Sequence, residues 1–220
     1  PSGGADATTA AYLLNRWQAN NNNRSFLLGV ASDGSLFLRI SSNGSTSTLT
    51  SSATSLITAN SWLHVSLVFQ SNVYKVYLNG TERISYSSSS VPANVTAPFM
   101  IGYIISGSNS VLDDFSGKIS DVRIVDGTAI VPPSGGPTSP LTAVTNTKLL
   151  MSGQGAKVFD KSQSANLALY GGAAGHATTK FSGAFSVEFD DGILETISSF
   201  KFESPAKTRM LLAPAGAVVY

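Results

Sequence analysis

The sequence contains no cysteine, and this absence excludes several kinds of chemistry. A disulfide framework, a cysteine-ligated zinc site and a thiol nucleophile all require that residue. With 42% hydrophobic residues over 220 positions, the chain has enough apolar side chains to fold without such cross-links. We therefore expect a sizeable core, in one large β domain or in one domain plus part of another.

Charge is scarce as well, because only 12% of the residues are Asp, Glu, Lys or Arg. The 14 basic and 13 acidic residues are scattered, and no basic stripe is present that could neutralise phosphates. Nucleic acid is therefore not expected as a partner. Ser, Thr, Asn and Gly must cover much of the surface, as is typical of assembly contacts and of exposed virion or cell-surface modules.

Long apolar runs are also missing from the sequence. No run approaches the roughly 20 residues that a membrane-spanning helix needs, and no basic stretch followed by an apolar one indicates a signal peptide. We expect a soluble chain that does not have a membrane as its partner.

Short alternating segments separated by turn residues make up most of the chain, while helical periodicity is nearly absent. Asp33-Gly34 and Asn43-Gly44 are dipeptides that tolerate the positive φ angles of tight hairpin turns. The run 85–98, with two prolines, is predicted to be a polar loop. The pattern predicts an all-β sandwich, with strands at 10–17, 25–31, 35–41, 64–70, 73–79, 99–105 and within 115–130.

Three ordered motifs within residues 10–130 resemble those of one known family. WLHVSLVFQSNVYKVYLNGT (62–81) resembles the W-x-H-V hairpin of laminin-G-like, concanavalin-A-like domains. FMIGY (99–103) lies where that family has its I-G strand, and FSGKISDVRIVDGTAI (115–130) is similar to the strand near its end. The resemblance implies a concanavalin-A-like (laminin-G-like) jelly-roll β-sandwich of two antiparallel sheets.

A second resemblance concerns the segment PPSGGPTSPLTAVTNTKLLM (132–151). It is similar to the tail that follows this domain in many bacteriophage and cyanophage virion proteins. That likeness implies a non-enzymatic structural protein at the surface of a phage particle, as a capsid decoration or as part of a tail fibre or spike. Its expected partners are other virion proteins and further copies of itself in a homo-oligomer.

The motifs predict three parts of the chain. Residues 1–133 would form the sandwich, 134–140 a Pro/Gly-rich connector, and 141–220 a β-rich C-terminal part. The segment 157–192 resembles the beginning of such a domain although it follows the end motif. The C-terminal part therefore either completes the same sandwich in permuted order or starts a second jelly roll. Docking onto the first unit is favoured, since the apolar end 210–220 would otherwise form an uncovered strand.

The segment NRWQANNNNRS (15–25) is the candidate glycan-binding site. Aromatic faces stack on sugars, and amide side chains form paired hydrogen bonds with their hydroxyls. A host surface glycan is thus the alternative partner, and a lectin-like carbohydrate-binding module is the alternative function. The opposing interpretation is a hairpin tip beside a core tryptophan. The candidate residues are Trp17, Asn21, Asn22, Asn23 and Arg24.

Carboxylates suggest two further sites. Asp113 and Asp114 follow a long loop, and the family resemblance implies that such rim carboxylates can bind Ca²⁺, which takes six to eight oxygen ligands. The alternative is a solvated turn, and no other cofactor is expected. A glycosidase pair could be drawn from four acidic residues around Gly192, but their spacing fits a strand-turn-strand hairpin better. We expect no enzyme activity and no catalytic residue; those four are Glu188, Asp190, Asp191 and Glu195.

Overall fold

The computed structural model describes residues 11–105, 111–112, 115–154, 157–162, 167–171, 174–176, 186–189 and 192–196. These residues form strands and loops, with one short 3-10 helix at Asn20–Asn22. No helix in this part of the chain has the length and apolarity that crossing a membrane requires. The predicted all-β fold is confirmed.

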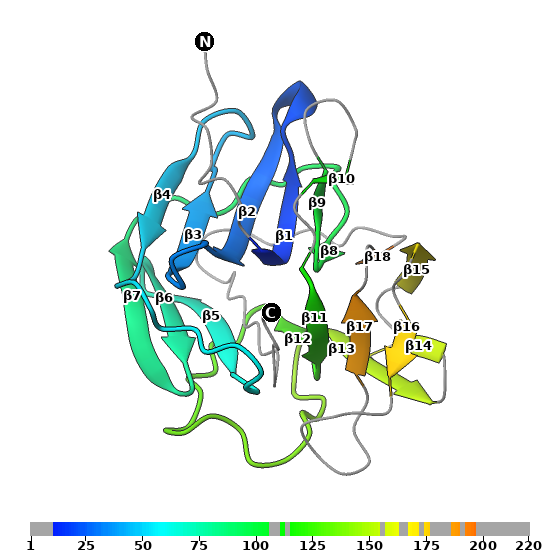
Figure 1. Cartoon of the computed structure of the whole chain (residues 1–220). Coiled ribbons are helices and arrows are strands. Elements are labelled where there is room, and N and C mark those ends of the chain that lie inside the picture. Colours follow the sequence, from blue (N-terminus) through cyan, green and yellow to red (C-terminus); the bar gives the residue numbers. More distant parts are fainter. Residues whose placement is uncertain are drawn as a thin grey trace.

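One layer of the sandwich is a nine-stranded sheet with the order β15-β18-β8-β1-β2-β3-β4, to which β9 and β10 are attached beside β1 (Figure 1). Its pairs are antiparallel except for a single parallel contact between Gln18 and Ile105. The strands are β1 (Ala11–Gln18), β2 (Asn23–Val30), β3 (Leu36–Ile40), β4 (Thr48–Ser51), β8 (Met100–Ile101), β9 (Ile104–Ile105), β10 (Val111–Leu112), β15 (Leu167–Gly171) and β18 (Gly192–Thr196).

Three further sheets of three strands each have the orders β5-β6-β7, β11-β17-β16 and β12-β13-β14. Their strands are β5 (Val65–Gln70), β6 (Val73–Leu78), β7 (Thr81–Ser87), β11 (Gly117–Ser120), β12 (Arg123–Val125), β13 (Thr147–Gln154), β14 (Lys157–Asp160), β16 (Ala174–His176) and β17 (Ser186–Phe189).

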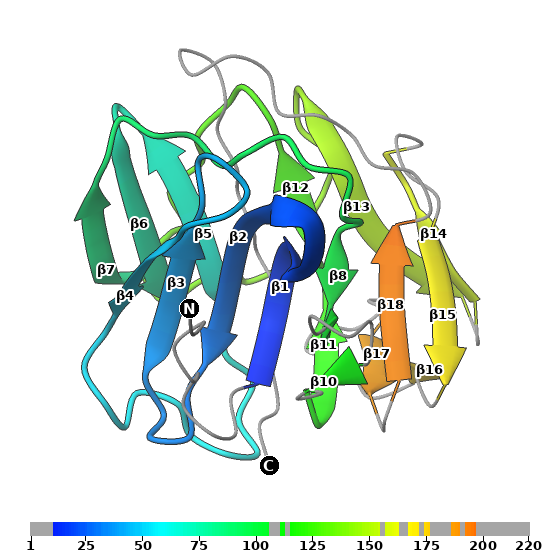
Figure 2. The ribbon, with the colours of Figure 1, turned by 90° about the horizontal axis from the view of Figure 1, so that it is seen from above.

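The main core lies between the large sheet and the smaller ones (Figure 2). Alternate residues of β2 and β3 point inward, for example Phe26 and Leu38, and they meet Leu67 and Val76 from β5 and β6. Leu149 of β13 is buried in the same cluster. Fully burying one such side chain contributes about 1.5–3 kcal/mol, so this cluster is the main source of stability.

The two turns of the hairpin 62–81 are built from residues with positive φ angles. Ser71 and Asn72, between β5 and β6, have φ angles of 51° and 63°. Asn79 and Gly80, between β6 and β7, have φ angles of 48° and 75°. Two positive φ angles in succession match the twist of the flanking strands, which explains why Asn-Gly is found here.

Three predictions about strands are wrong. The strand expected at 99–105 is two short strands, β8 and β9, with Gly102 at a φ of 81° between them. The single strand expected within 115–130 is two strands, β11 and β12, because Asp121 between them adopts a φ of 53° and breaks the pairing. The polar run from residue 85 begins with the end of a strand, β7, in which Ile84 is the one fully buried side chain. An edge strand with a single buried side chain shows little hydrophobic alternation in its sequence.

Strand pairs connect the parts of the chain on either side of the predicted connector 134–140. β12 pairs with β13, β11 pairs with β17, and β8 pairs with β18. In each pair one strand precedes the connector and the other follows it. The described strands after residue 141 thus extend the sheets that the earlier strands begin.

Candidate functional site

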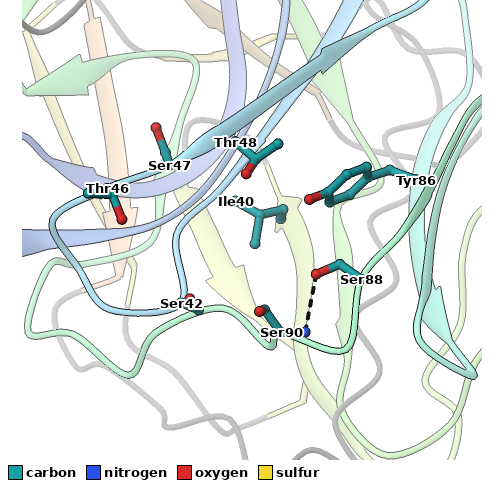
Figure 3. A pocket seen from close by; sticks show the side chains of 8 residues that line it. All are labelled: Ile40, Ser42, Thr46, Ser47, Thr48, Tyr86, Ser88 and Ser90. Carbon is teal, nitrogen blue, oxygen red and sulfur yellow. Dashed lines mark hydrogen bonds between the residues drawn. The ribbon is translucent and has the colours of Figure 1, made fainter.

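A groove lies at one edge of the sandwich, between the loop that joins β3 to β4 and the end of β7. Its volume is about 310 Å³. Figure 3 shows the lining side chains around a common space, with the Tyr86 hydroxyl pointing towards Ile40. Six of the eight are serine or threonine and none is charged; the lining consists of Ile40, Ser42, Thr46, Ser47, Thr48, Tyr86, Ser88 and Ser90.

The β7 side of this groove is fixed by aromatic packing. The Tyr86 ring stacks on the Tyr74 ring, with 6.3 Å between centroids, and Tyr74 stacks in turn on Phe69 at 4.2 Å. The Tyr74 hydroxyl donates a hydrogen bond to the Ser90 carbonyl oxygen at 2.7 Å, and burial raises the pKa of Tyr74. The Ser90 N–H donates to Ser88 Oγ at 3.1 Å. Tyr86 is partly buried, so its ring is held in place while one side faces the groove.

The opposite side of the groove is the loop 41–47, which side-chain hydrogen bonds hold in one conformation. Asn43 Oδ1 accepts hydrogen bonds from the N–H groups of Ser45 and Thr46, both at 2.9 Å. This asparagine turn satisfies backbone donors that a strand would otherwise pair. Ser41 Oγ accepts a further bond from the Gly44 N–H at 3.0 Å. The Thr46 hydroxyl takes part in this turn, since it accepts a hydrogen bond from Asn43 Nδ2 at 2.9 Å. These bonds fix the loop that carries Thr46 and Ser47.

The predicted glycan-binding segment lies directly beside this loop. The Arg24 N–H donates to the Gly44 carbonyl oxygen at 3.1 Å, and Arg24 Nη1 donates to Ser45 O at 2.6 Å. Gly44 has a φ of 84°, and a Cβ there would lie 2.0 Å from Asn22 O. Only glycine fits this position, because both the conformation and the close approach exclude a side chain.

Trp17 has a packing role in this structure. Only 6% of its surface is exposed, and its ring packs in a second apolar cluster with Tyr12, Leu27, Phe37 and Ile104. The Arg24 guanidinium lies 6.0 Å from the Trp17 ring centroid. The ring does not offer an open face for stacking on a sugar, so the structure agrees with the alternative of a core tryptophan beside a hairpin tip.

The asparagines of the segment have different surroundings. Asn23 Oδ1 accepts hydrogen bonds from the N–H groups of Thr96 and Ala97 at 2.9 and 3.1 Å, and its amide donates to Gln18 at 3.0 Å. Asn22 is exposed with a φ of 55°, and the side chain of Asn21 lies outside the described residues. Asn23 thus secures the loop 91–97, and glycan binding by this segment stays a prediction.

Arg16 is a buried cation that the sequence did not single out. Its Nε donates to Ala97 O at 2.9 Å, its Nη2 donates to Val95 O, and its guanidinium lies 5.5 Å from the Phe99 ring centroid. Burial lowers the pKa of Arg16 to about 10. The only sequence signal was a charged residue at a position of β1 that alternation predicts to face the core. Arg16 and Asn23 together hold the loop that follows the groove residues of β7.

The predicted calcium ligands, Asp113 and Asp114, lie outside the described residues. Among the residues that are described, no three His, Cys, Asp or Glu side chains come together as a metal site would require. Asp121, near them in sequence, is buried and accepts a hydrogen bond from Ser120 Oγ at 2.7 Å. Burial raises the pKa of Asp121. Calcium binding stays a prediction with no support from the described carboxylates.

The glycosidase alternative depended on acidic residues around Gly192. Glu188 belongs to β17 and Glu195 to β18, and these strands enter different sheets. The expected hairpin around Gly192 is therefore wrong, because β17 pairs with β11 and β16 while β18 pairs with β8 and β15. Asp190 and Asp191 lie outside the described residues.

Comparison with known families agrees with this architecture. The family described as the concanavalin A-like lectin/glucanases superfamily matches residues 2–130. The chain belongs to this superfamily, and its fold is a concanavalin-A-like jelly roll. No curated protein and no solved structure matches the chain.

Proposed function

We propose that this chain is a non-enzymatic adhesion module that binds carbohydrate in the groove between loop 41–47 and the end of β7. The observation that carries the proposal is the lining of the groove, in which six hydroxyl side chains surround one fixed tyrosine ring and no charge is present. Membership of the concanavalin A-like superfamily is compatible with carbohydrate binding.

The chemistry of the groove suits a sugar for two reasons. A sugar ring has hydroxyl groups at its edge and an apolar C–H face. Serine and threonine hydroxyls can each donate hydrogen bonds to the sugar hydroxyls and accept bonds from them. Tyr86 and Ile40 supply apolar contact for the C–H face. Because hydrogen bonds already fix both sides of the groove, binding would not need to order these loops.

A glycan array probed with the full chain tests this proposal. We expect binding to one or more glycans, and we expect Tyr86→Ala to weaken it about 5- to 30-fold, as the loss of one aromatic contact of about 1–2 kcal/mol implies. Tyr86→Phe keeps the ring and should retain most of the affinity. Since no carboxylate lines the groove, a chelator should leave binding unchanged.

The matched control is Ser85→Ala. Ser85 is exposed on β7 next to Tyr86, but strand alternation places it on the other face, so its removal should not affect binding. Urea unfolding of each variant separates a loss of binding from a loss of fold. Equal affinity of Tyr86→Ala and the unchanged protein, or no binding to any glycan, would refute the proposal.

A second proposal, that the chain is a phage virion component, is favoured by the edge strand β4 together with the phrase PTSPLTAV (137–144). The Ser52 N–H donates to Leu36 O at 2.9 Å, so Ser52 faces β3 with its backbone polar groups. In an antiparallel pair every second residue does so, and the N–H and C=O groups of Leu49 and Ser51 therefore point away from β3. β4 ends its sheet among the described strands, and it has no charge or proline to block pairing. Leu49 is 52% exposed.

The partner that fits this edge is a second copy of the chain. Two uncharged β4 strands can pair antiparallel without opposing like charges, and their exposed Leu49 side chains would then cover one another. β7 is a poorer edge, since Glu82 and Arg83 are exposed on it and a bulge interrupts its pairing with β6. On a particle, such contacts would join copies within a decoration or a fibre.

Sedimentation of the protein over a range of concentrations tests the β4 contact. We expect reversible self-association that Leu49→Lys abolishes, because the lysine would place two cations opposite each other across the new pair. Val131→Lys is the control, since Val131 is 57% exposed and lies away from β4 in sequence. A protein that stays monomeric at high concentration, or a Leu49→Lys variant that still associates, would rule out this contact.

A further inference from the structure

The segment 129–137, here called the strap, packs on the outer face of β5 and β6 through Ala129 and Ile130, which contact Val68 and Tyr77. It lies within the connection between β12 and β13 (Figure 1). The Gly135 N–H donates to Asn79 O at 2.9 Å, and a Cβ on Gly80 would lie 2.0 Å from Pro133 O. The strap therefore rests on the turn between β6 and β7, at a distance that only glycine allows.

His64 is the side chain beneath the strap. It is 5% exposed, and a Cβ on Gly136 would lie 3.0 Å from the His64 Cβ. The His64 backbone is fixed to the same turn, because its N–H donates to Asn79 Oδ1 and its carbonyl oxygen accepts from Asn79 N–H, both at 2.8 Å. Neither ring nitrogen has a hydrogen-bond partner among the described residues.

In the part of the chain that the structure describes, no negative charge stabilises a proton on His64. Arg123 of β12 is the nearby charge and is itself largely buried, with Nη1 donating to Thr142 O at 2.8 Å. Tyr77 of β6 is a further ionisable residue, and it packs in an apolar cluster with Val68 and Val125. The strap contains no ionisable residue. Of the carboxylates that flank β12, Asp121 accepts a hydrogen bond from Ser120 Oγ, and Asp126 donates its backbone N–H to Asn146 O at 3.1 Å. Among the described residues, Arg123 is the charge that shifts the pKa of His64.

We propose that the strap is an acid-released cover: protonation of His64 opens it and exposes the apolar strip of Val68, Tyr77 and Val125 beneath the connection. In the closed state that strip packs against Ala129 and Ile130 of the strap. The cause is electrostatic, since a second buried cation beside Arg123 is unstable without an anion, whereas in the open state water can solvate it.

The size of the effect follows from the two states of the imidazole. With the strap closed, the pKa of His64 is lowered to about 4, mainly by burial and in addition by the Arg123 charge. An exposed histidine has a pKa of about 6.5. Between these values the open state binds more protons, so acid favours opening. From pH 7 to pH 4.5 the open fraction should rise on the order of 50-fold.

Hydrogen exchange of the full chain at pH 7 and pH 4.5, corrected for the intrinsic pH dependence of exchange, tests this proposal. We expect the Gly135 and Asn79 amides to lose protection in acid by about that factor, while core amides of β2 do not. His64→Phe keeps a planar ring at this position, sacrifices no hydrogen bond of the ring and cannot be protonated, so its strap should stay closed at both pH values.

Replacement of the other histidine, as His176→Phe, is the control and should leave the acid response as it is. An NMR titration of the unchanged protein supplies a readout that does not depend on a variant. A His64 that titrates near 6.5, strap amides with equal protection at both pH values, or a His64→Phe protein that opens as the unchanged one does would each overturn the proposal.

Discussion

Gly80 and Gly135 have nearly the same backbone conformation, with φ angles of 75° and 81°, but different surroundings. A Cβ on Gly80 would lie 2.0 Å from Pro133 O, whereas a Cβ on Gly135 would have nothing within 4 Å. Both positions impose the cost of a left-handed conformation on any other residue. Substitutions at the two glycines can therefore distinguish the cost of backbone strain, which both share, from the cost of losing the contact between the turn and the strap, which only Gly80 makes.

We expect Gly135→Ala to lower the free energy of unfolding by about 1 kcal/mol, from conformation alone. Gly80→Ala should lower it by about 3 kcal/mol or more, because the strap must also move away from the turn. Urea unfolding measures both values. Equal losses for the two variants would show that the strap does not rest on this turn.

The type of a residue predicts its backbone conformation better than it predicts which residues surround its side chain. The positive φ angles of Gly34 and Gly44 were predictable from the dipeptides Asp33-Gly34 and Asn43-Gly44, since few residues tolerate positive φ. The burial of Trp17 could not be decided from a loop composition that also suits sugar binding. Tyr86 stood in a serine-rich run that was predicted to be a loop, so its place in the groove depended on pairing with β6 that the sequence does not specify.

At the scale of elements, long strands with strict alternation were predicted to within a few residues, as β1, β2, β5 and β6 show. β4 and β7 were missed in whole or in part, because the edge strands of a sandwich need only one apolar face, and β4 is exposed along most of its length. These same two strands border the groove. The candidate site therefore lies where hydrophobic patterning is weakest and where polar residues are free to serve binding.

At the scale of the whole molecule, the strand pairs across the connector make the described chain one set of sheets. Leu38 of β3 and Leu149 of β13 are fully buried in the same apolar cluster, although the connector separates them in sequence. A cluster that includes residues from both sides of 134–140 should unfold as a unit.

We expect one cooperative transition in calorimetry, and we expect Leu38→Ala and Leu149→Ala each to shift that same transition by a loss of about 2–5 kcal/mol. Ser85→Ala serves as the surface control and should leave the midpoint unchanged. Two transitions, each sensitive to only one of the leucine variants, would instead support a second jelly roll after residue 141.

The central claim is that the groove between loop 41–47 and Tyr86 holds a carbohydrate, and the structure of the protein bound to its best glycan tests this most directly. We predict a sugar ring in contact with Tyr86 and Ile40, with its hydroxyls bonded to Thr46, Ser47 or Ser88. A sugar bound elsewhere on the sandwich, with the groove filled only by water, would contradict the claim.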